Sequence, residues 1–203
     1  MVGLDDFKES RTMILYILDL EQFEKSEYCE ELPKHKKRHV AGQFLIRLAL
    51  GEEACNKAEF AMGEHGKPYM VGEPIHYNIS HSGQYVVLVT ANSEVGVDIQ
   101  EKRSSYKESV AKRFFSDKEW KDISKCESEE DKKESFYRIW CSKESYGKYL
   151  GTGLSTEVLQ TNVLVDVDDV QWIEYEAVNG YQLCICNRKG EHIEKIIRVF
   201  EGL

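Results

Sequence analysis

Three residues spaced four apart, Trp140, Glu144 and Lys148, have the types and the spacing to do chemistry. On a helix they would lie on one face, where an aromatic ring, a carboxylate and an ammonium would line up. The same spacing suits an ordinary surface ion pair between Glu144 and Lys148, worth about 0.2–0.5 kcal/mol. The spacing alone leaves both interpretations open.

A second acidic residue falls on a predicted strand far upstream. The segment Gly96-Val97-Asp98-Ile99-Gln100 is short and apolar apart from Asp98 and Gln100. Because residues two apart on a strand face the same side, these two polar side chains should point together. A carboxylate on this strand and Glu144 on the helix could share one divalent cation.

The apolar periodicity predicts the elements that must position these side chains. Strands are expected at 13–20, 77–79, 85–91, 95–99, 158–165, 171–177, 181–187 and 195–200, and helices at 38–50, 106–115, 116–124 and 129–150. Ser116 and Glu119 form a capping box at the start of one helix. The last four strands are expected to close an antiparallel sheet. The fold class is therefore predicted to be α+β, with two halves that meet near residue 100, where ligand clefts tend to form.

Composition restricts the class of protein. The chain has 203 residues, 41% hydrophobic and 31% charged, and a net charge of −9. That charge argues against general nucleic-acid binding, which depends on lysine and arginine. No apolar run approaches the roughly 20 residues that span a bilayer, and residues 1–11 do not have the pattern of a signal peptide. We therefore expect a cytoplasmic protein without nucleic-acid or membrane partners.

The six cysteines include no C-x-x-C unit, so reduced thiols are expected. Cys184 and Cys186 would share one face of a strand. That arrangement could suit a soft metal, but core packing is the favoured interpretation because no further ligands lie nearby in sequence.

Four motifs together resemble one enzyme family. In addition to the segments at 96–100 and 140–148, the chain contains Asn78-Ile79-Ser80-His81-Ser82-Gly83 and His65-Gly66-Lys67-Pro68. Their order and spacing resemble those of the 4'-phosphopantetheinyl transferases, in particular the larger, monomeric, surfactin-synthetase-activating type. The resemblance implies two similar α+β halves in a pseudo-two-fold arrangement, with the active site at their junction, and a monomer.

The resemblance also implies a reaction and roles for individual residues. The enzyme would transfer the 4'-phosphopantetheine group of coenzyme A to a serine hydroxyl of an apo acyl or peptidyl carrier protein, releasing adenosine 3',5'-bisphosphate. Mg²⁺ would be held by Asp98, Glu144 and Gln100. Glu144 would accept the serine proton, directly or through a metal-bound water, and Lys148 would hold the pyrophosphate, which makes Asp98, Glu144 and Lys148 the catalytic set. Coenzyme A would be bound by Arg38, Lys67, Pro68, Ser80, His81 and Lys148.

The resemblance divides these roles between the two halves. Residues 1–100 would contact the 3'-phosphate and adenine of coenzyme A and supply the first metal ligand. Residues 101–203 would supply the catalytic helix and the carrier-protein docking surface. Within the catalytic motif, Lys143 is expected either to support the position of the helix or to take part in the site.

Two departures from the family pattern bear on the site. The pattern G-[IV]-D-[IV]-E has a glutamate where this chain has Gln100, whose amide oxygen can coordinate but brings no charge. The basic run before the first long helix is compressed, so that only Arg38 is matched. Which of Lys34, Lys36 and Lys37 contacts a phosphate is left open.

The carrier protein would have to dock on a local basic patch, because the chain is acidic overall. The strongest candidate is a strip in which basic residues alternate with Val110, Phe114 and Phe115; its basic members are Lys102, Arg103, Lys107, Lys112 and Arg113. An amphipathic helix with a core-facing side explains the aromatic residues equally well.

Two other functions compete with the transferase. The first is a coenzyme A or carrier-protein binding module that has lost turnover because Gln100 weakens the metal site. The second, a metal-dependent phosphohydrolase, is weaker, because the chain lacks a cluster of acidic and histidine ligands for two metals.

Overall fold

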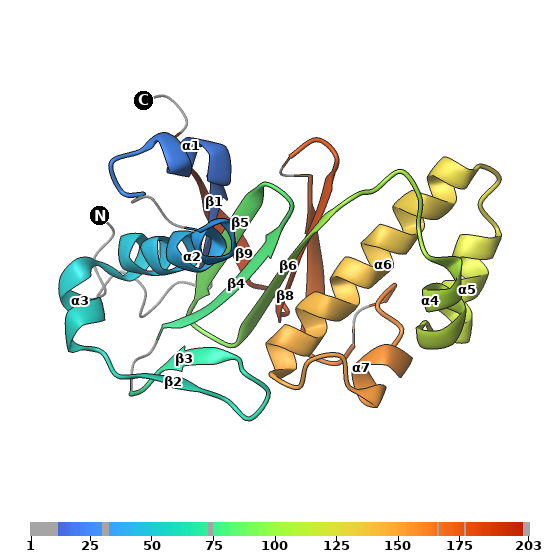
Figure 1. Cartoon of the computed structure of the whole chain (residues 1–203). Coiled ribbons are helices and arrows are strands. Elements are labelled where there is room, and N and C mark those ends of the chain that lie inside the picture. Colours follow the sequence, from blue (N-terminus) through green and yellow to red (C-terminus); the bar gives the residue numbers. More distant parts are fainter. Residues whose placement is uncertain (1–11, 30–32, 73–74, 166, 177, 201–203) are drawn as a thin grey trace.

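Two sheets form the middle of the molecule, and helices cover their outer faces (Figure 1). The computed structural model describes residues 12–29, 33–72, 75–165, 167–176 and 178–200. The strands are β1 (Thr12–Asp19), β2 (Phe60–Met62), β3 (Pro68–Met70), β4 (His76–Ser82), β5 (Tyr85–Ala91), β6 (Val95–Glu101), β7 (Val170–Tyr175), β8 (Tyr181–Arg188) and β9 (His192–Val199). The helices are α1 (Leu20–Lys25), α2 (Lys34–Leu50), α3 (Glu52–Lys57), α4 (Glu108–Phe114), α5 (Asp117–Ser124), α6 (Glu129–Leu150) and α7 (Thr156–Gln160).

The first sheet has the strand order β4-β5-β1-β9, and the second has the order β6-β8-β7. Within the first sheet, β1 is antiparallel to β5 and parallel to β9. The second sheet is antiparallel throughout. Strands β2 and β3 form a separate hairpin.

Strand β1 is apolar along its length because both of its faces are buried. Ile14, Tyr16 and Leu18 pack in the cluster that contains Ala41 and Leu45 of α2. The alternate residues of the strand, Met13, Leu15 and Ile17, pack with residues of β6 and β8. Helix α6 packs on the outer side of β6 and β8 (Figure 1). The order of layers is thus helix, first sheet, second sheet, helix.

Polar side chains join the two sheets along β4 and β6. Alternate side chains of β4 accept hydrogen bonds from alternate backbone amides of β6: Asn78 Oδ1 from Val97 at 2.8 Å, Ser80 Oγ from Ile99 at 3.4 Å, and Ser82 Oγ from Glu101 at 3.0 Å. Since buried backbone amides need a partner, these side chains replace the strand that β6 lacks on this edge. The segment 78–83 therefore connects the two sheets and is also a candidate ligand-binding motif.

Most predicted elements are confirmed. The α+β class is correct, α6 has the predicted bounds, and the capping box formed by Ser116 and Glu119 is present. Cys184 and Cys186 are buried in the core as expected. The end of the predicted strand 171–177 falls at Ala177, which lies outside the described residues.

Four predictions about elements are wrong. The segment 158–165 is not a strand: Ser155 caps α7 by accepting a hydrogen bond from the Val158 amide at 3.3 Å. The last strand is not part of an antiparallel sheet, because β9 pairs parallel with β1. Helix α2 begins at Lys34, directly after Pro33, so Arg38 lies one turn inside it. The strand predicted at 77–79 is longer, because β4 continues to Ser82 and includes His81.

Each sheet carries a long helix, which is consistent with two similar halves. The strand pairing nevertheless joins residues from both sides of position 100. β6, which ends at Glu101, pairs with β8, and β9, near the end of the chain, pairs with β1. No helix in the described ranges is both long and apolar enough to cross a membrane.

Candidate active site

Strand β6 and helix α6 approach each other unusually closely, and Gly96 makes this possible. A Cβ atom at this position would lie 2.0 Å from the Ser145 carbonyl oxygen and 2.4 Å from the Tyr149 amide nitrogen. Any larger residue would push the helix away from the strand. The glycine thus brings Asp98, two residues further along β6, against the part of α6 that carries Glu144 and Lys148.

Asp98 is the centre of a polar cluster at this contact, and it is only 2% exposed. Its Oδ1 accepts hydrogen bonds from Lys148 Nζ at 2.7 Å and from Ser80 Oγ at 2.8 Å. Its Oδ2 accepts from Gln100 Nε2 at 2.7 Å. Lys148 Nζ also donates to Ser80 Oγ at 2.7 Å and to the Val97 carbonyl at 3.0 Å. The predicted residues Asp98, Gln100, Lys148 and Ser80 therefore meet in one place.

Glu144 lies one helical turn before Lys148 and in the electrostatic field of Asp98. Burial raises the pKa of Glu144 to about 7, and the negative charge of Asp98 adds to this shift, while the Lys148 ammonium opposes it. No hydrogen bond or ion pair joins the Glu144 carboxylate to another described residue. Glu144 is thus a partly buried carboxylate that has no hydrogen-bond partner and lies in the field of a second carboxylate. A cation bound between the two would be stabilised by both negative charges.

The donor set around this pair fits Mg²⁺. Asp98, Glu144 and the amide of Gln100 offer hard oxygen ligands from two adjacent elements, and Mg²⁺ is commonly held by one or two carboxylates together with water. The described residues include no group of three or more histidine, cysteine or acidic side chains placed to hold a metal.

Two cations, Arg38 and Lys148, act on His81 of β4. His81, next to Ser80 on β4, has a lowered pKa, first because burial disfavours the charged ring and second because the Arg38 guanidinium repels it, with a smaller repulsion from Lys148. Arg38 comes from α2 and donates to the Gly83 carbonyl at 2.8 Å. Arg38 and Lys148 both act on the imidazole of His81, so an anionic group placed near this ring would be favoured.

The structure does not bring Lys67 to the same place as Arg38. The ammonium of Lys67 contacts Glu94 at 2.6 Å, near the beginning of β4 and β6, whereas Arg38 contacts Gly83 beyond the end of β4. A strand of this length spans roughly 20 Å. Pro68 follows on β3, where it pairs with Met62 in the hairpin. Of the other basic candidates, Lys37 pairs with Glu24 at 2.8 Å, and the side chain of Lys34 lies outside the described residues.

Lys143 has a structural position. Its side chain is 0% exposed, and its ammonium pairs with the equally buried Glu119 at 2.9 Å. It also donates to the carbonyls of Leu159 at 2.9 Å and Thr161 at 2.8 Å. Lys143 thus holds α6 against α5 and the end of α7, which is one of the two interpretations that the sequence left open.

Trp140 is part of the same packing. Its ring lies parallel to that of Phe136, with centroids 6.2 Å apart and an interplanar angle of 5°. Phe115 stacks on both rings. The indole belongs to a core cluster between α4, α5 and α6 rather than forming an aromatic floor beside Glu144.

Sequence reasoning missed three contributors to the site. Asn78 and Ser82 hold the edge of β6, and Cys141 donates from its thiol to the Asp98 carbonyl at 3.2 Å. The two-residue spacing of Asn78, Ser80 and Ser82 was a visible signal, because it places all three on one face of a strand. The sequence has no comparable signal for Cys141.

Known proteins are similar to this chain in sequence. Residues 94–194 match the family model described as the 4'-phosphopantetheinyl transferase superfamily. The 4'-phosphopantetheinyl transferase ffp of Bacillus subtilis is 32% identical over 200 residues, covering 89% of this chain and 88% of the relative. The 4'-phosphopantetheinyl transferase Sfp of Bacillus subtilis (strain 168) is 30% identical over 194 residues, covering 87% and 86%. The L-aminoadipate-semialdehyde dehydrogenase-phosphopantetheinyl transferase of Homo sapiens is 33% identical over 138 residues, covering 60% and 45%.

The fold and the site define an α+β transferase whose acidic and basic groups meet between a strand of one sheet and the helix that covers it. The chain belongs to the 4'-phosphopantetheinyl transferase superfamily, as the matched region and the extent of identity to its relatives show.

Proposed function

We propose that this protein transfers the 4'-phosphopantetheine group of coenzyme A to a serine hydroxyl of an apo acyl or peptidyl carrier protein, and releases adenosine 3',5'-bisphosphate. The observation that carries this proposal is the convergence of Asp98, Glu144 and Lys148 at the contact of β6 with α6. An unpartnered carboxylate, a second carboxylate and an ammonium in one cluster match what phosphoryl transfer requires, namely positioning and neutralisation of charge.

In this reaction the serine oxygen forms a bond to the β-phosphorus of coenzyme A. The bond from that phosphorus to the bridging oxygen breaks, and the bisphosphate leaves with the electron pair. Lys148 stabilises the negative charge of the pyrophosphate because its ammonium is a compact cation beside the site. Glu144 takes the serine proton, directly or through a water molecule. A pKa of about 7 suits a general base at neutral pH, because about half of such carboxylates are ionised there.

Mg²⁺ is the proposed metal, and Asp98, Glu144 and Gln100 would hold it. When bound, it supplies neutralisation of charge on the phosphate oxygens. Gln100 Nε2 donates to Asp98 Oδ2, so its amide group already lies at the carboxylate that would bind the ion. This supports the inclusion of Gln100 in the metal site despite its lack of charge.

Coenzyme A is proposed to lie along β4, where Ser80, His81 and Arg38 face the anionic end of the ligand. The electrostatic coupling of His81 to both Arg38 and Lys148 supports a continuous path for phosphate groups from α2 to α6. Pro68 and the backbone at Lys67 would border this path from the hairpin. The division of roles between residues 1–100 and 101–203 is proposed on the same basis.

The carrier protein is proposed to dock on the basic strip between β6 and α5. Phe115 is buried in the core cluster, while the side chains of Lys112 and its partner Glu108 are more than half exposed. The aromatic residues thus pack inward and basic residues lie on the outer side, where Lys102 pairs with Glu134 and Lys112 with Glu108. The monomeric state and the cytoplasmic location remain predictions, as does the absence of nucleic-acid and membrane partners.

The test is direct transfer. The protein is incubated with coenzyme A, Mg²⁺ and either an apo acyl carrier protein or an apo peptidyl carrier protein, and intact mass is measured. A phosphopantetheine adduct is expected, and none should form when the acceptor serine is replaced by alanine or the metal is chelated. Coenzyme A binding without an adduct on any carrier would support the alternative, a binding module. Bisphosphate release without a carrier would instead indicate a phosphohydrolase.

A further inference from the structure

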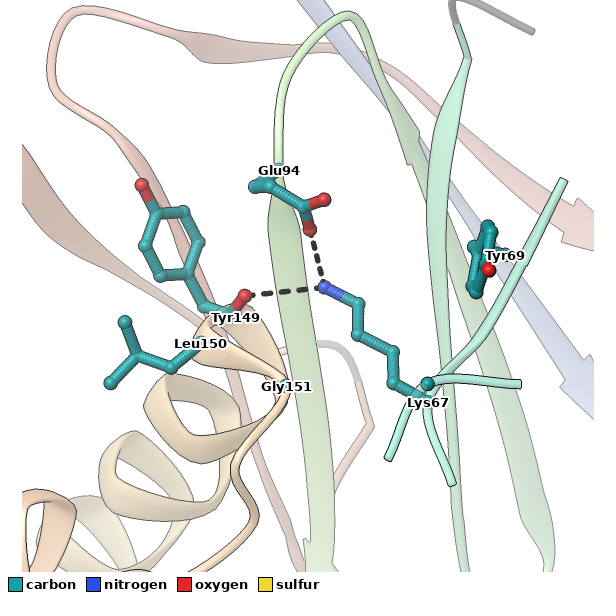
Figure 2. Close-up of a pocket in the computed structure, with 7 residues that line it drawn as sticks. Lys67, Tyr69, Glu94, Tyr149, Leu150 and Gly151 are labelled. Carbon is teal, nitrogen blue, oxygen red and sulfur yellow. Dashed lines mark hydrogen bonds and ion pairs between the residues drawn. The ribbon is translucent and has the colours of Figure 1, made fainter. Parts of the chain in front are cut away.

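The ammonium of Lys67 is held by three acceptors from two other parts of the chain. It donates to Glu94 Oε2 at 2.6 Å, to the Val95 carbonyl at 3.1 Å and to the Tyr149 carbonyl at 3.2 Å. Figure 2 shows the amine between Glu94, in the turn before β6, and the last turn of α6. A lysine ammonium has three N–H donors, so these contacts satisfy it completely.

The surroundings of Lys67 keep it in this arrangement. Its side chain is only 16% exposed. Glu94 is ionised, because a hydrogen bond from His76 and then the one from Lys67 lower its pKa to about 2. The carbonyl of Tyr149 is among the last four of α6, which have no partner within the helix and favour a positive charge. A phosphate group would have to displace an ionised carboxylate and two carbonyls to reach the amine.

Two of the three acceptors belong to the elements that build the active site, and Glu94 directly precedes one of them, β6. Val95 is the first residue of β6 and lies three residues before Asp98. Tyr149 directly follows Lys148 on α6. The amine therefore joins the start of β6 to the end of α6, next to Gly96, where the two backbones touch. It also anchors the hairpin β2–β3, since Lys67 immediately precedes Pro68 of β3.

We propose that Lys67 and Glu94 form a positioning pair, which holds β6 against α6 and so sets the distance between Asp98 and the Glu144 and Lys148 side chains. Lys67 then contributes no direct charge contact to coenzyme A, contrary to the role that the family resemblance implies for it. This inference rests on the proposed transferase function and refines the coenzyme site within it.

A pocket of about 450 Å³ beside the pair is consistent with this role, because the pair closes one of its walls. The residues that line it come from the hairpin, the turn before β6 and the end of α6: Gly63, Lys67, Tyr69, Glu94, Tyr149, Leu150 and Gly151 (Figure 2). The Tyr69 ring lies apart from the hydrogen-bonded group in that view.

The experiment compares Lys67→Met with Glu94→Gln in the full-length protein. If the pair positions the site, both variants should lower transfer by about 10- to 100-fold, as the loss of supporting contacts around a metal site does. Both should raise the Mg²⁺ concentration for half-maximal activity, which a smaller folded fraction would not change. The double variant should be no worse than the poorer single variant, since the two residues act as a unit.

Binding provides a readout independent of turnover. Calorimetric titration with coenzyme A and with 3'-dephospho-coenzyme A should give the same ratio of affinities in the original protein and in both variants. A direct phosphate contact predicts otherwise: Lys67→Met would weaken binding, whereas Glu94→Gln would leave it unchanged or tighten it by releasing the amine. That opposite behaviour would overturn the proposal, and so would an unchanged Mg²⁺ dependence in both variants.

Two controls complete the design. Lys57→Met removes an exposed lysine that pairs with Glu53 outside the site, and it should leave transfer and Mg²⁺ dependence unchanged. Thermal unfolding checks that each variant folds, and Glu94→Gln, which keeps the size of the side chain, carries the test if Lys67→Met does not fold. Absence of transfer in the original protein would refute the proposed function itself, which separates the two failures.

Discussion

Lys143 and Glu144 are neighbours on α6, yet their surroundings differ completely. Lys143 points into the contact of α6 with α5, where Glu119 and the carbonyls of Leu159 and Thr161 satisfy its ammonium. Glu144 points to the contact with β6, where Asp98 repels it and no described residue donates to it. The charge of Lys143 on one face of the helix is fully paired, whereas that of Glu144 on the other face is not.

The difference separates a structural charge from a functional one. A buried charge with a full set of partners stabilises one arrangement and has no capacity left for a ligand. A carboxylate with a raised pKa and no partner stores unfavourable energy that a cation or a proton can relieve, which is typical of active sites. Substitutions on the two faces should therefore affect different properties.

The largest effect is expected from Glu144→Gln. Loss of the carboxylate removes the proposed base and a metal ligand, so transfer should fall by about 10³-fold or more. Stability at pH 8 should be unchanged or higher, because an unpartnered charge is removed. Intact-mass kinetics and thermal unfolding test both parts, with Glu157→Gln, on the exposed side of α7, as the matched control. A variant that loses activity and stability together would contradict the contrast between the two faces.

Lys143→Met should show the opposite pattern, with the effect on stability. It leaves Glu119 buried and charged without its partner, which typically costs about 3–5 kcal/mol. Denaturant unfolding should show this loss, while the folded fraction retains most of its transfer rate. Adding Glu119→Gln should restore part of the stability, because the remaining amide no longer carries a buried charge. A Lys143→Met protein of normal stability would show that the network is not needed for folding.

The pH dependence of stability should also distinguish the faces. Glu144 has a pKa of about 7 in the folded protein against an ordinary value of 4.5. Between these values the folded state holds a proton that the unfolded state has lost, so stability falls as pH rises through this window. Without metal, the melting temperature of the original protein relative to Glu144→Gln should therefore drop as the pH rises from about 4.5 through about 7, and should level off above that. Added Mg²⁺ should stabilise the original protein more at the higher pH, and an equal effect at both would count against metal binding by ionised Glu144.

Local patterns predicted much of this fold and site. The three-residue spacing of Ser116 and Glu119 predicted the start of α5. The helical spacing of Trp140, Glu144 and Lys148 indicated α6. Residues two apart on a strand share a face, so the sequence predicted that the side chains of Asp98 and Gln100 point together. Their hydrogen bond confirms this. Each of these signals lies within a few residues, where backbone geometry alone determines which side chains share a face.

What could not be predicted depends on contacts between distant segments. The parallel pairing of β9 with β1 joins the two ends of the described chain, and no local pattern encodes it. The position of Lys67 required three elements to be placed at once. Cys141 and Gly96 matter because two backbones nearly touch, which only the assembled structure reveals.

Gln100→Glu is expected to have the smallest effect on transfer. It tests whether Gln100 belongs to the metal site on the Glu144 side of α6. A glutamate here would add a third negative charge beside Asp98 and Glu144, so that Mg²⁺ should bind more tightly. The Mg²⁺ concentration for half-maximal transfer should fall by several-fold, while stability without metal should drop slightly because the hydrogen bond to Asp98 Oδ2 becomes a repulsion. Gln160→Glu adds the same charge at an exposed position of α7 and should change neither quantity. Identical metal titrations for Gln100→Glu and the original protein would place Gln100 outside the metal site, which would leave Asp98 and Glu144 as the proposed ligands.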